Sequence, residues 1–185
     1  MLLHCKPILA VVISLAALFG SPCSAPAADQ TGAEKVKLPV KVAVVDAVKW
    51  NGESVGNIQV TYADGTKDRW TTKGGCGLAR VAADGTVGWN VFEGERRARS
   101  ASYNIRPNGT MVMCRKGKVL CRVQAALGFV EEWNFTKDGK RFVVKSRALH
   151  GPATIELRET DTGKVVQSVQ ASDANVPAWA APYRE

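Results

Sequence analysis

The residues with the clearest chemical potential form a basic run in the middle of the chain. Residues 96 to 130 contain no Asp or Glu, but they contain eight cations: Arg96, Arg97, Arg99, Arg106, Arg115, Lys116, Lys118 and Arg122. Guanidinium groups bind phosphate and carboxylate in a forked geometry. If the segment lies on one surface, all of these cations except Arg106 are candidate ligand-binding residues for an anionic partner. If it does not, the charge only keeps the protein soluble.

Three of the five cysteines lie beyond the N-terminal segment, at positions 76, 114 and 121. A two-residue turn at Gly117-Lys118 would place Cys114 directly across an antiparallel ladder from Cys121, at a separation that suits a disulfide. We therefore predict a Cys114–Cys121 disulfide, which leaves Cys76 free, buried or bonded to another chain. Three scattered cysteines and one histidine lack the close-spaced pairs of a zinc site, so we expect no metal and no cofactor.

His150 is the only histidine after the N-terminal segment, and it lies in a turn sequence, Leu-His-Gly-Pro. A hydrolase could use it with Ser146 and Asp161 if the fold brought the three side chains together, because such a site is defined by geometry. The sequence has no nucleophile-elbow pattern, G-x-S-x-G, to support that alternative. We therefore predict a structural histidine and a protein that is not an enzyme.

The N-terminus has the pattern of an export signal. Residues 8 to 19 are apolar except for Ser14. That run is shorter than the roughly 20 residues that a membrane-spanning helix needs, and it has the length of a signal-peptide core. The small residues of Ala25-Pro26-Ala27 follow, so we predict a signal peptide over 1–27 and a flexible lead-in over 28–36. A single domain over 37–185, in the periplasm or outside the cell and without a membrane span, is then expected.

The elements that must position these residues are predicted to be strands. Short runs rich in β-branched and aromatic residues flank five dipeptides that favour tight turns: Asp64-Gly65, Asp84-Gly85, Asn108-Gly109, Asp138-Gly139 and Thr162-Gly163. The pattern indicates an all-β protein with two antiparallel four-stranded meanders, over 78–123 and 133–169. Trp89 and Trp133 are expected in its core. The similar length and order of the two units also suggest an internal repeat.

The second unit resembles blades of WD40-like β-propeller proteins. The resemblance lies in Val-Glu-Glu-Trp-Asn-Phe-Thr-Lys-Asp-Gly-Lys at 130–140, Ser-Arg-Ala-Leu-His-Gly-Pro at 146–152 and Glu-Leu-Arg at 156–158. More narrowly, the chain is similar to small exported proteins with propeller-like repeats. The resemblance implies a fold and no activity. A closed ring needs at least about four blades, more than this chain can supply. The expected fold is therefore an incomplete propeller, a ring completed by a second subunit, or a small β-sandwich.

These patterns together predict an exported, non-enzymatic binding or assembly module. Its basic surface would contact an acidic protein or an anionic polymer of the cell envelope. No nucleic-acid reader motif is present, so we expect no dedicated nucleic acid ligand. An inhibitor of a secreted enzyme such as a lysozyme is the alternative from another class. The positive charge argues against that target, since lysozymes are themselves basic and like charges repel.

Overall fold

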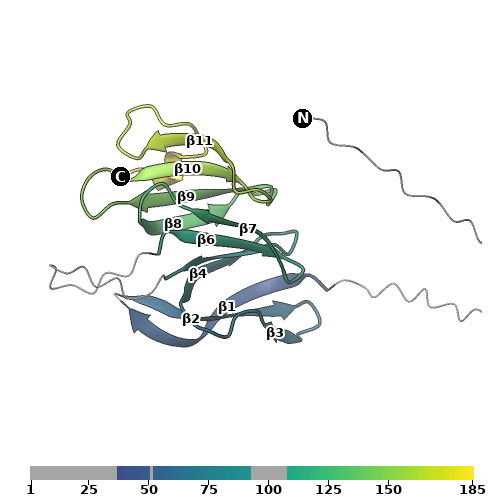
Figure 1. Cartoon of the computed structure of the whole chain (residues 1–185). Coiled ribbons are helices and arrows are strands. Elements are labelled where there is room, and N and C mark those ends of the chain that lie inside the picture. Colours follow the sequence, from purple (N-terminus) through teal and green to yellow (C-terminus); the bar gives the residue numbers. More distant parts are fainter. Residues whose placement is uncertain (1–36, 51, 93–107) are drawn as a thin grey trace, which may run out of the picture. The chain divides into compact units, whose positions relative to one another are not determined.

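The computed structural model describes residues 37–50, 52–92 and 108–185. The chain divides after Glu34 into two units, and all described residues belong to the second, Lys35–Glu185. The predicted signal peptide (1–27) and lead-in (28–36) lie outside the described residues, as do Arg96, Arg97 and Arg99 of the basic run. The described part of the chain consists of antiparallel strands and one short 3-10 helix, η1 (Ala181–Tyr183), so the predicted all-β class is confirmed (Figure 1).

The first sheet is antiparallel, with the strand order β1-β2-β4-β5-β6-β7 and with β3 paired to β2. Its strands are β1 (Pro39–Trp50), β2 (Glu53–Tyr62), β3 (Lys67–Arg69), β4 (Cys76–Val81), β5 (Val87–Val91), β6 (Thr110–Arg115) and β7 (Lys118–Gln124). The predicted meander over 78–123 corresponds to β4 through β7. The N-terminal hairpin extends this unit through one bridge between β2 and β4, at Gly56 and Cys76.

The second sheet is a meander of four strands in the order β11-β10-β9-β8. Its strands are β8 (Phe129–Phe135), β9 (Arg141–Arg147), β10 (Thr154–Glu159) and β11 (Val165–Gln170). Each strand pairs with its neighbour in the sequence, as predicted for the unit over 133–169. Neither sheet closes on itself.

Three hydrophobic clusters alternate with the layers of strands. The first lies between the β1–β2 hairpin and the face of β4, β5 and β6 that carries Trp89. The second lies between the two sheets, with Met111 and Met113 on one side and Trp133 on the other. The third lies on the outer face of the second sheet, where the C-terminal segment contributes Ala180. Successive residues of a strand point to opposite faces, so β6 supplies side chains to two clusters at once.

Trp133 joins the two sheets. Its side chain is 1% exposed, and its indole Nε1 donates a hydrogen bond of 2.6 Å to the carbonyl of Leu78. The Trp133 ring occupies the space that a side chain at position 88 would need. A Cβ on Gly88 would come within 2.5 Å of that ring. Trp133 and Trp89 are both buried, which confirms their predicted place in the core.

Four of the five predicted turn dipeptides form turns between paired strands. Gly65, Gly85, Gly139 and Gly163 all have positive φ, which glycine adopts without steric cost. Asn108-Gly109 is different. The Asn108 side chain accepts a hydrogen bond from the N–H of Val130 and donates one to its carbonyl, at 2.8 and 3.0 Å. At this position the amide therefore connects the start of β6 to β8.

Candidate functional site

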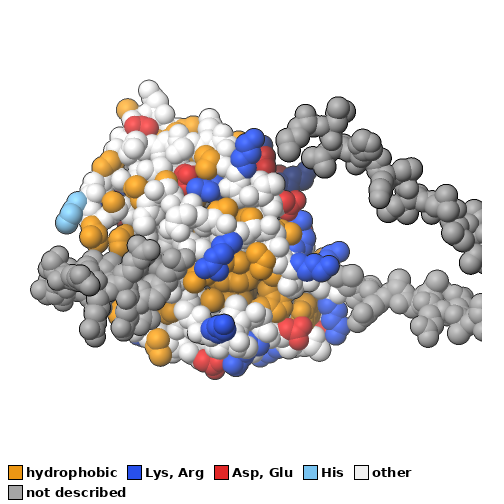
Figure 2. Space-filling view, in the orientation of Figure 1, with side chains coloured by type: hydrophobic (Ala, Val, Ile, Leu, Met, Phe, Trp, Pro, Cys, Tyr) orange, Lys and Arg blue, Asp and Glu red, His pale blue; other side chains and the backbone are white. Residues whose placement is uncertain are grey.

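A groove of about 690 Å³ lies between β3 and the face of β5, β6 and β7. We call it the apolar groove. Its floor carries Trp89, Val91, Val112, Cys114 and Val119, and one wall is the segment 70–74. Figure 2 shows an apolar patch bordered by Lys and Arg side chains, between the positions that β3 and β7 occupy in Figure 1. Among the described residues, the rest of its lining includes no carboxylate but three cations: Arg69, Lys73 and Arg122.

The two-residue period of the strands and their register determine which side chains form the floor of the groove. Trp89 of β5 lies opposite Val112 of β6, and both side chains turn away from the second sheet. The residues that flank Val112, Met111 and Met113, point to the second sheet instead. Trp89 and Val112 are 5% and 4% exposed, whereas Val119 on β7 is 62% exposed. The groove is thus deepest over β5 and β6 and opens to solvent at β7.

The wall of the groove is held by Asn57, a buried residue of β2. Its Oδ1 accepts a hydrogen bond of 2.7 Å from the N–H of Gly74. Its Nδ2 donates one of 3.2 Å to the carboxylate of Asp46. Thr71 Oγ1 accepts a hydrogen bond of 2.8 Å from the N–H of Ile58, so β2 fixes both ends of the segment 70–74. The bonds that involve the main-chain N–H groups of Gly74 and Ile58 give the wall a defined conformation, although Gly74 alone would favour a flexible loop.

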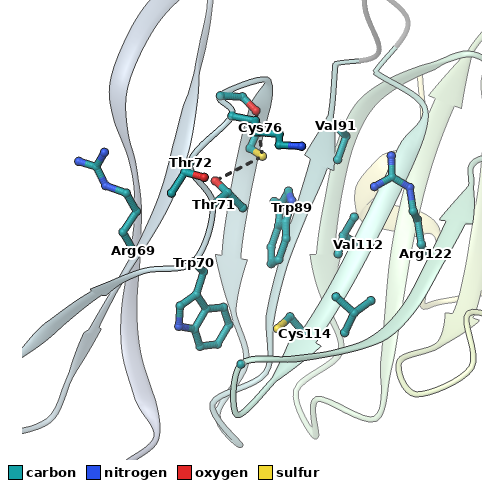
Figure 3. Close-up of a pocket in the computed structure, with 14 residues that line it drawn as sticks. Arg69, Trp70, Thr71, Thr72, Cys76, Trp89, Val91, Val112, Cys114 and Arg122 are labelled. Atoms are coloured by element: carbon teal, nitrogen blue, oxygen red, sulfur yellow. Dashed lines mark hydrogen bonds between the residues drawn. The ribbon is translucent and has the colours of Figure 1, made fainter.

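The three cations come from three different elements. Arg69 ends β3 and forms an ion pair of 2.8 Å with Asp46. Lys73 is exposed on the wall, and it forms no ion pair with any described residue. Arg122 is exposed on β7. Figure 3 shows Arg69 and Arg122 on opposite sides of the groove, with Trp89 between them. Because Arg69 is paired with Asp46, an occupant of the groove would meet positive charge from Lys73 on the wall and from Arg122 on β7.

Two buried thiols also line the groove. Burial raises the pKa of Cys114 from 9.0 to about 11. Burial also raises the pKa of Cys76, while the Thr71 hydroxyl and the Arg122 guanidinium act in the opposite direction. The Cys76 S–H donates to the Thr71 hydroxyl at 3.8 Å. Both thiols therefore stay protonated at neutral pH, and they contribute apolar surface rather than nucleophiles.

The predicted Cys114–Cys121 disulfide is not present, and all three described cysteines are free. The predicted turn at Gly117-Lys118 was wrong by one residue, because the loop is Lys116-Gly117 and Arg115 pairs with Lys118. A bulge then pairs Cys114 with Val119 and Cys121 with Met113. The sulfur of Cys114 faces the first cluster, and that of Cys121 packs against the second. The two cysteines thus lie on opposite faces of the sheet.

Arg115 is engaged within the molecule. Its guanidinium forms ion pairs with Asp84 at 3.0 Å and Asp161 at 2.9 Å, and its Nε donates to Thr86 Oγ1 at 2.7 Å. Asp84 lies in the β4–β5 turn and Asp161 in the β10–β11 turn, so this side chain joins the two sheets. Among the other predicted ligand residues, Lys116 and Lys118 are exposed on the β6–β7 hairpin, and Arg122 lines the groove.

The residues of the hydrolase alternative are not joined by any contact in the described part of the chain. Ser146 is fully buried, and its Oγ accepts the N–H of Leu127 at 3.1 Å. Asp161 forms the ion pair with Arg115. His150 is exposed in the loop between β9 and β10.

Arg69 and Lys73 were not among the predicted site residues. Lys73 belongs to a glycine-rich stretch whose spacing fits no phosphate loop, and Arg69 lies in a short strand outside the basic run. The only feature of the sequence that could have indicated them is their position on either side of Trp70, an aromatic residue in a polar stretch.

No protein-family model and no curated protein matches the sequence. Within the described ranges, no three His, Cys, Asp or Glu side chains are grouped to hold a metal ion. The same residues include no helix that is long and apolar enough to cross a membrane.

Proposed function

We propose that the protein is an exported, non-enzymatic binding module that holds an anionic partner in the apolar groove. The partner is an acidic protein or an anionic polymer of the cell envelope. One observation carries this proposal: three cations from separate elements border an apolar floor, and no carboxylate of the described residues lines the same groove. The N-terminal signal pattern supports export. Anionic polymers are abundant outside the cytoplasm, so an exported protein would meet them.

The groove suits an anion better than a uniformly charged surface does. Cations on both sides can contact one ligand at the same time, and the apolar floor excludes water beneath it. Hydrogen bonds to charged groups contribute about 1.5–3 kcal/mol each, compared with about 1 kcal/mol for neutral pairs. Lys116 and Lys118 extend the positive surface along the β6–β7 hairpin and would increase the rate of encounter.

The test is retention of the mature protein on heparin across a salt series. We compare a groove variant, Lys73→Gln with Arg122→Gln, to a matched control, Lys137→Gln with Arg141→Gln. Both variants lose one Lys and one Arg, and the control residues are exposed in the second sheet and its β8–β9 turn. The groove variant should elute at clearly lower salt, because two converging contacts are lost, while the control elutes close to the wild type.

Equal shifts in the two variants would contradict the proposal. They would show that heparin responds to net charge alone, which is the behaviour of a solvated basic face.

A further inference from the structure

The apolar groove is bordered by two strands whose outer edges pair with no other described strand. Among the described strands, β3 pairs only with β2 and β7 pairs only with β6. Both strands line the groove, β3 through Arg69 and β7 through Val119 and Arg122. A strand edge presents main-chain N–H and C=O groups that another extended chain can pair with. This arrangement favours an occupant that has a peptide backbone.

The floor and the cations specify the side chains of that occupant. Side chains of an extended chain alternate between two sides every residue. One set would contact the floor, where the exposed Val119 continues the buried surface of Trp89 and Val112. Arg122 lies on the same face of β7 as Val119, because it pairs with Val112 whereas Val119 pairs with Cys114, so this set would also meet the cations. Charge complementarity therefore requires that the groove-facing side chains, at every second position, include carboxylates as well as aliphatic or aromatic residues.

We propose that the partner is an acidic polypeptide segment that binds in extended conformation as an added strand on the outer edge of β7. The inference rests on the proposed function, since it names the partner class of the same groove. Main-chain hydrogen bonds to β7 provide affinity, and the apolar and acidic side chains that face the groove provide specificity. A polysaccharide lacks both the backbone N–H groups and the apolar side chains, so it would use the cations alone.

The test is titration of the mature protein with a short capped peptide in which every second residue would face the groove. These positions hold Glu and Val in turn, with Phe at the central apolar position, and Ser occupies the positions between them. Two further peptides carry N-methyl groups on alternate amides. In one peptide the odd-numbered amides are methylated, and in the other the even-numbered amides are. Only one set faces β7, so one methylated peptide should bind about tenfold or more weakly and the other should bind like the parent. Polyglutamate of equal charge should bind more weakly than the parent peptide.

A protein variant provides an independent measurement. Val119→Glu places a carboxylate in the groove at an exposed position, and it should abolish peptide binding without affecting folding. Val166→Glu is the matched control, because Val166 is an exposed valine on β11, an end strand of the second sheet. Unfolding curves of the two variants establish that both are folded.

Equal affinities for the three peptides, or a parent peptide that binds no better than polyglutamate, would overturn the inference. The proposed function would survive that result if Lys73→Gln with Arg122→Gln still weakened heparin retention. It would fail as well if neither heparin nor peptide binding depended on those two residues.

Discussion

Arg115 and Arg122 lie seven residues apart on the same β-hairpin, but their surroundings give them different roles. Arg115 is neutralised by Asp84 from the β4–β5 turn of the first sheet and by Asp161 from the β10–β11 turn of the second. Arg122 is exposed on the side of β7 that faces the apolar groove. A guanidinium that already has two carboxylate partners has little capacity for another anion. The basic run thus contributes to stability and to the candidate site through different residues.

The buried thiol of Cys114 makes stability sensitive to alkaline pH. Its pKa is raised from 9.0 to about 11 by burial, so the folded chain holds this proton more tightly than the unfolded chain. The resulting stabilisation, on the order of 3 kcal/mol at most, is complete below pH 9 and is lost as the pH rises to about 11. Urea unfolding of the mature protein between pH 8 and 10.5 should show this decline, and Cys114→Ala should show a smaller one. An equally steep decline in the variant would assign it to other groups.

At the scale of elements, the β6–β7 hairpin shows how one residue of register changes a prediction. Lys116 and Gly117 both have positive φ, at 53° and 72°. Two central residues with positive φ define a type I′ turn, which matches the twist of the flanking strands. Lysine is an uncommon choice at its first position, where asparagine is preferred. The turn geometry, rather than the residue preference, therefore fixed which pairs of β6 and β7 lie opposite each other.

Lys116→Asn is expected to stabilise the protein by about 0.5–1 kcal/mol, because asparagine tolerates the left-handed conformation. Gly117→Ala is expected to destabilise it by about 1 kcal/mol, because alanine at a φ of +72° is strained. Chemical denaturation measures both changes. If the turn were instead at Gly117-Lys118, position 116 would lie within a strand and asparagine there would be destabilising, since asparagine is depleted in strands.

At the scale of the whole molecule, the contact between the two sheets depends on one small residue. Gly88 of β5 lies beneath the ring of Trp133, and a Cβ there would also come within 2.7 Å of the Met113 sulfur. Both neighbours belong to the buried cluster between the sheets. Neither can move without displacing other core side chains, because interiors are close-packed. The sheets therefore approach each other closely only because this position has no side chain.

Gly88→Ala is expected to destabilise the protein by about 1–3 kcal/mol through overpacking. Gly128→Ala is the matched control, because a Cβ at that position meets no atom within 4 Å. The control should be neutral, or stabilising by about 0.4–1 kcal/mol through the unfolded state. Urea unfolding followed by tryptophan fluorescence measures both variants. A neutral Gly88→Ala would show that the two sheets can separate slightly without loss of stability.

The sequence by itself determined the strands, four of the turns and the two meanders, because period-two alternation and Asp-Gly turns act between neighbouring residues. It also identified Arg122 as a candidate site residue. Tertiary structure decided the rest. The bulge that puts Cys114 and Cys121 on opposite faces lies within one hairpin, but no residue pattern marks it. The carboxylates that neutralise Arg115, and the convergence of Arg69 and Lys73 with Arg122 on one groove, involve residues distant in sequence. A pattern within one strand cannot report such contacts, because packing between sheets selects which face of each strand is covered.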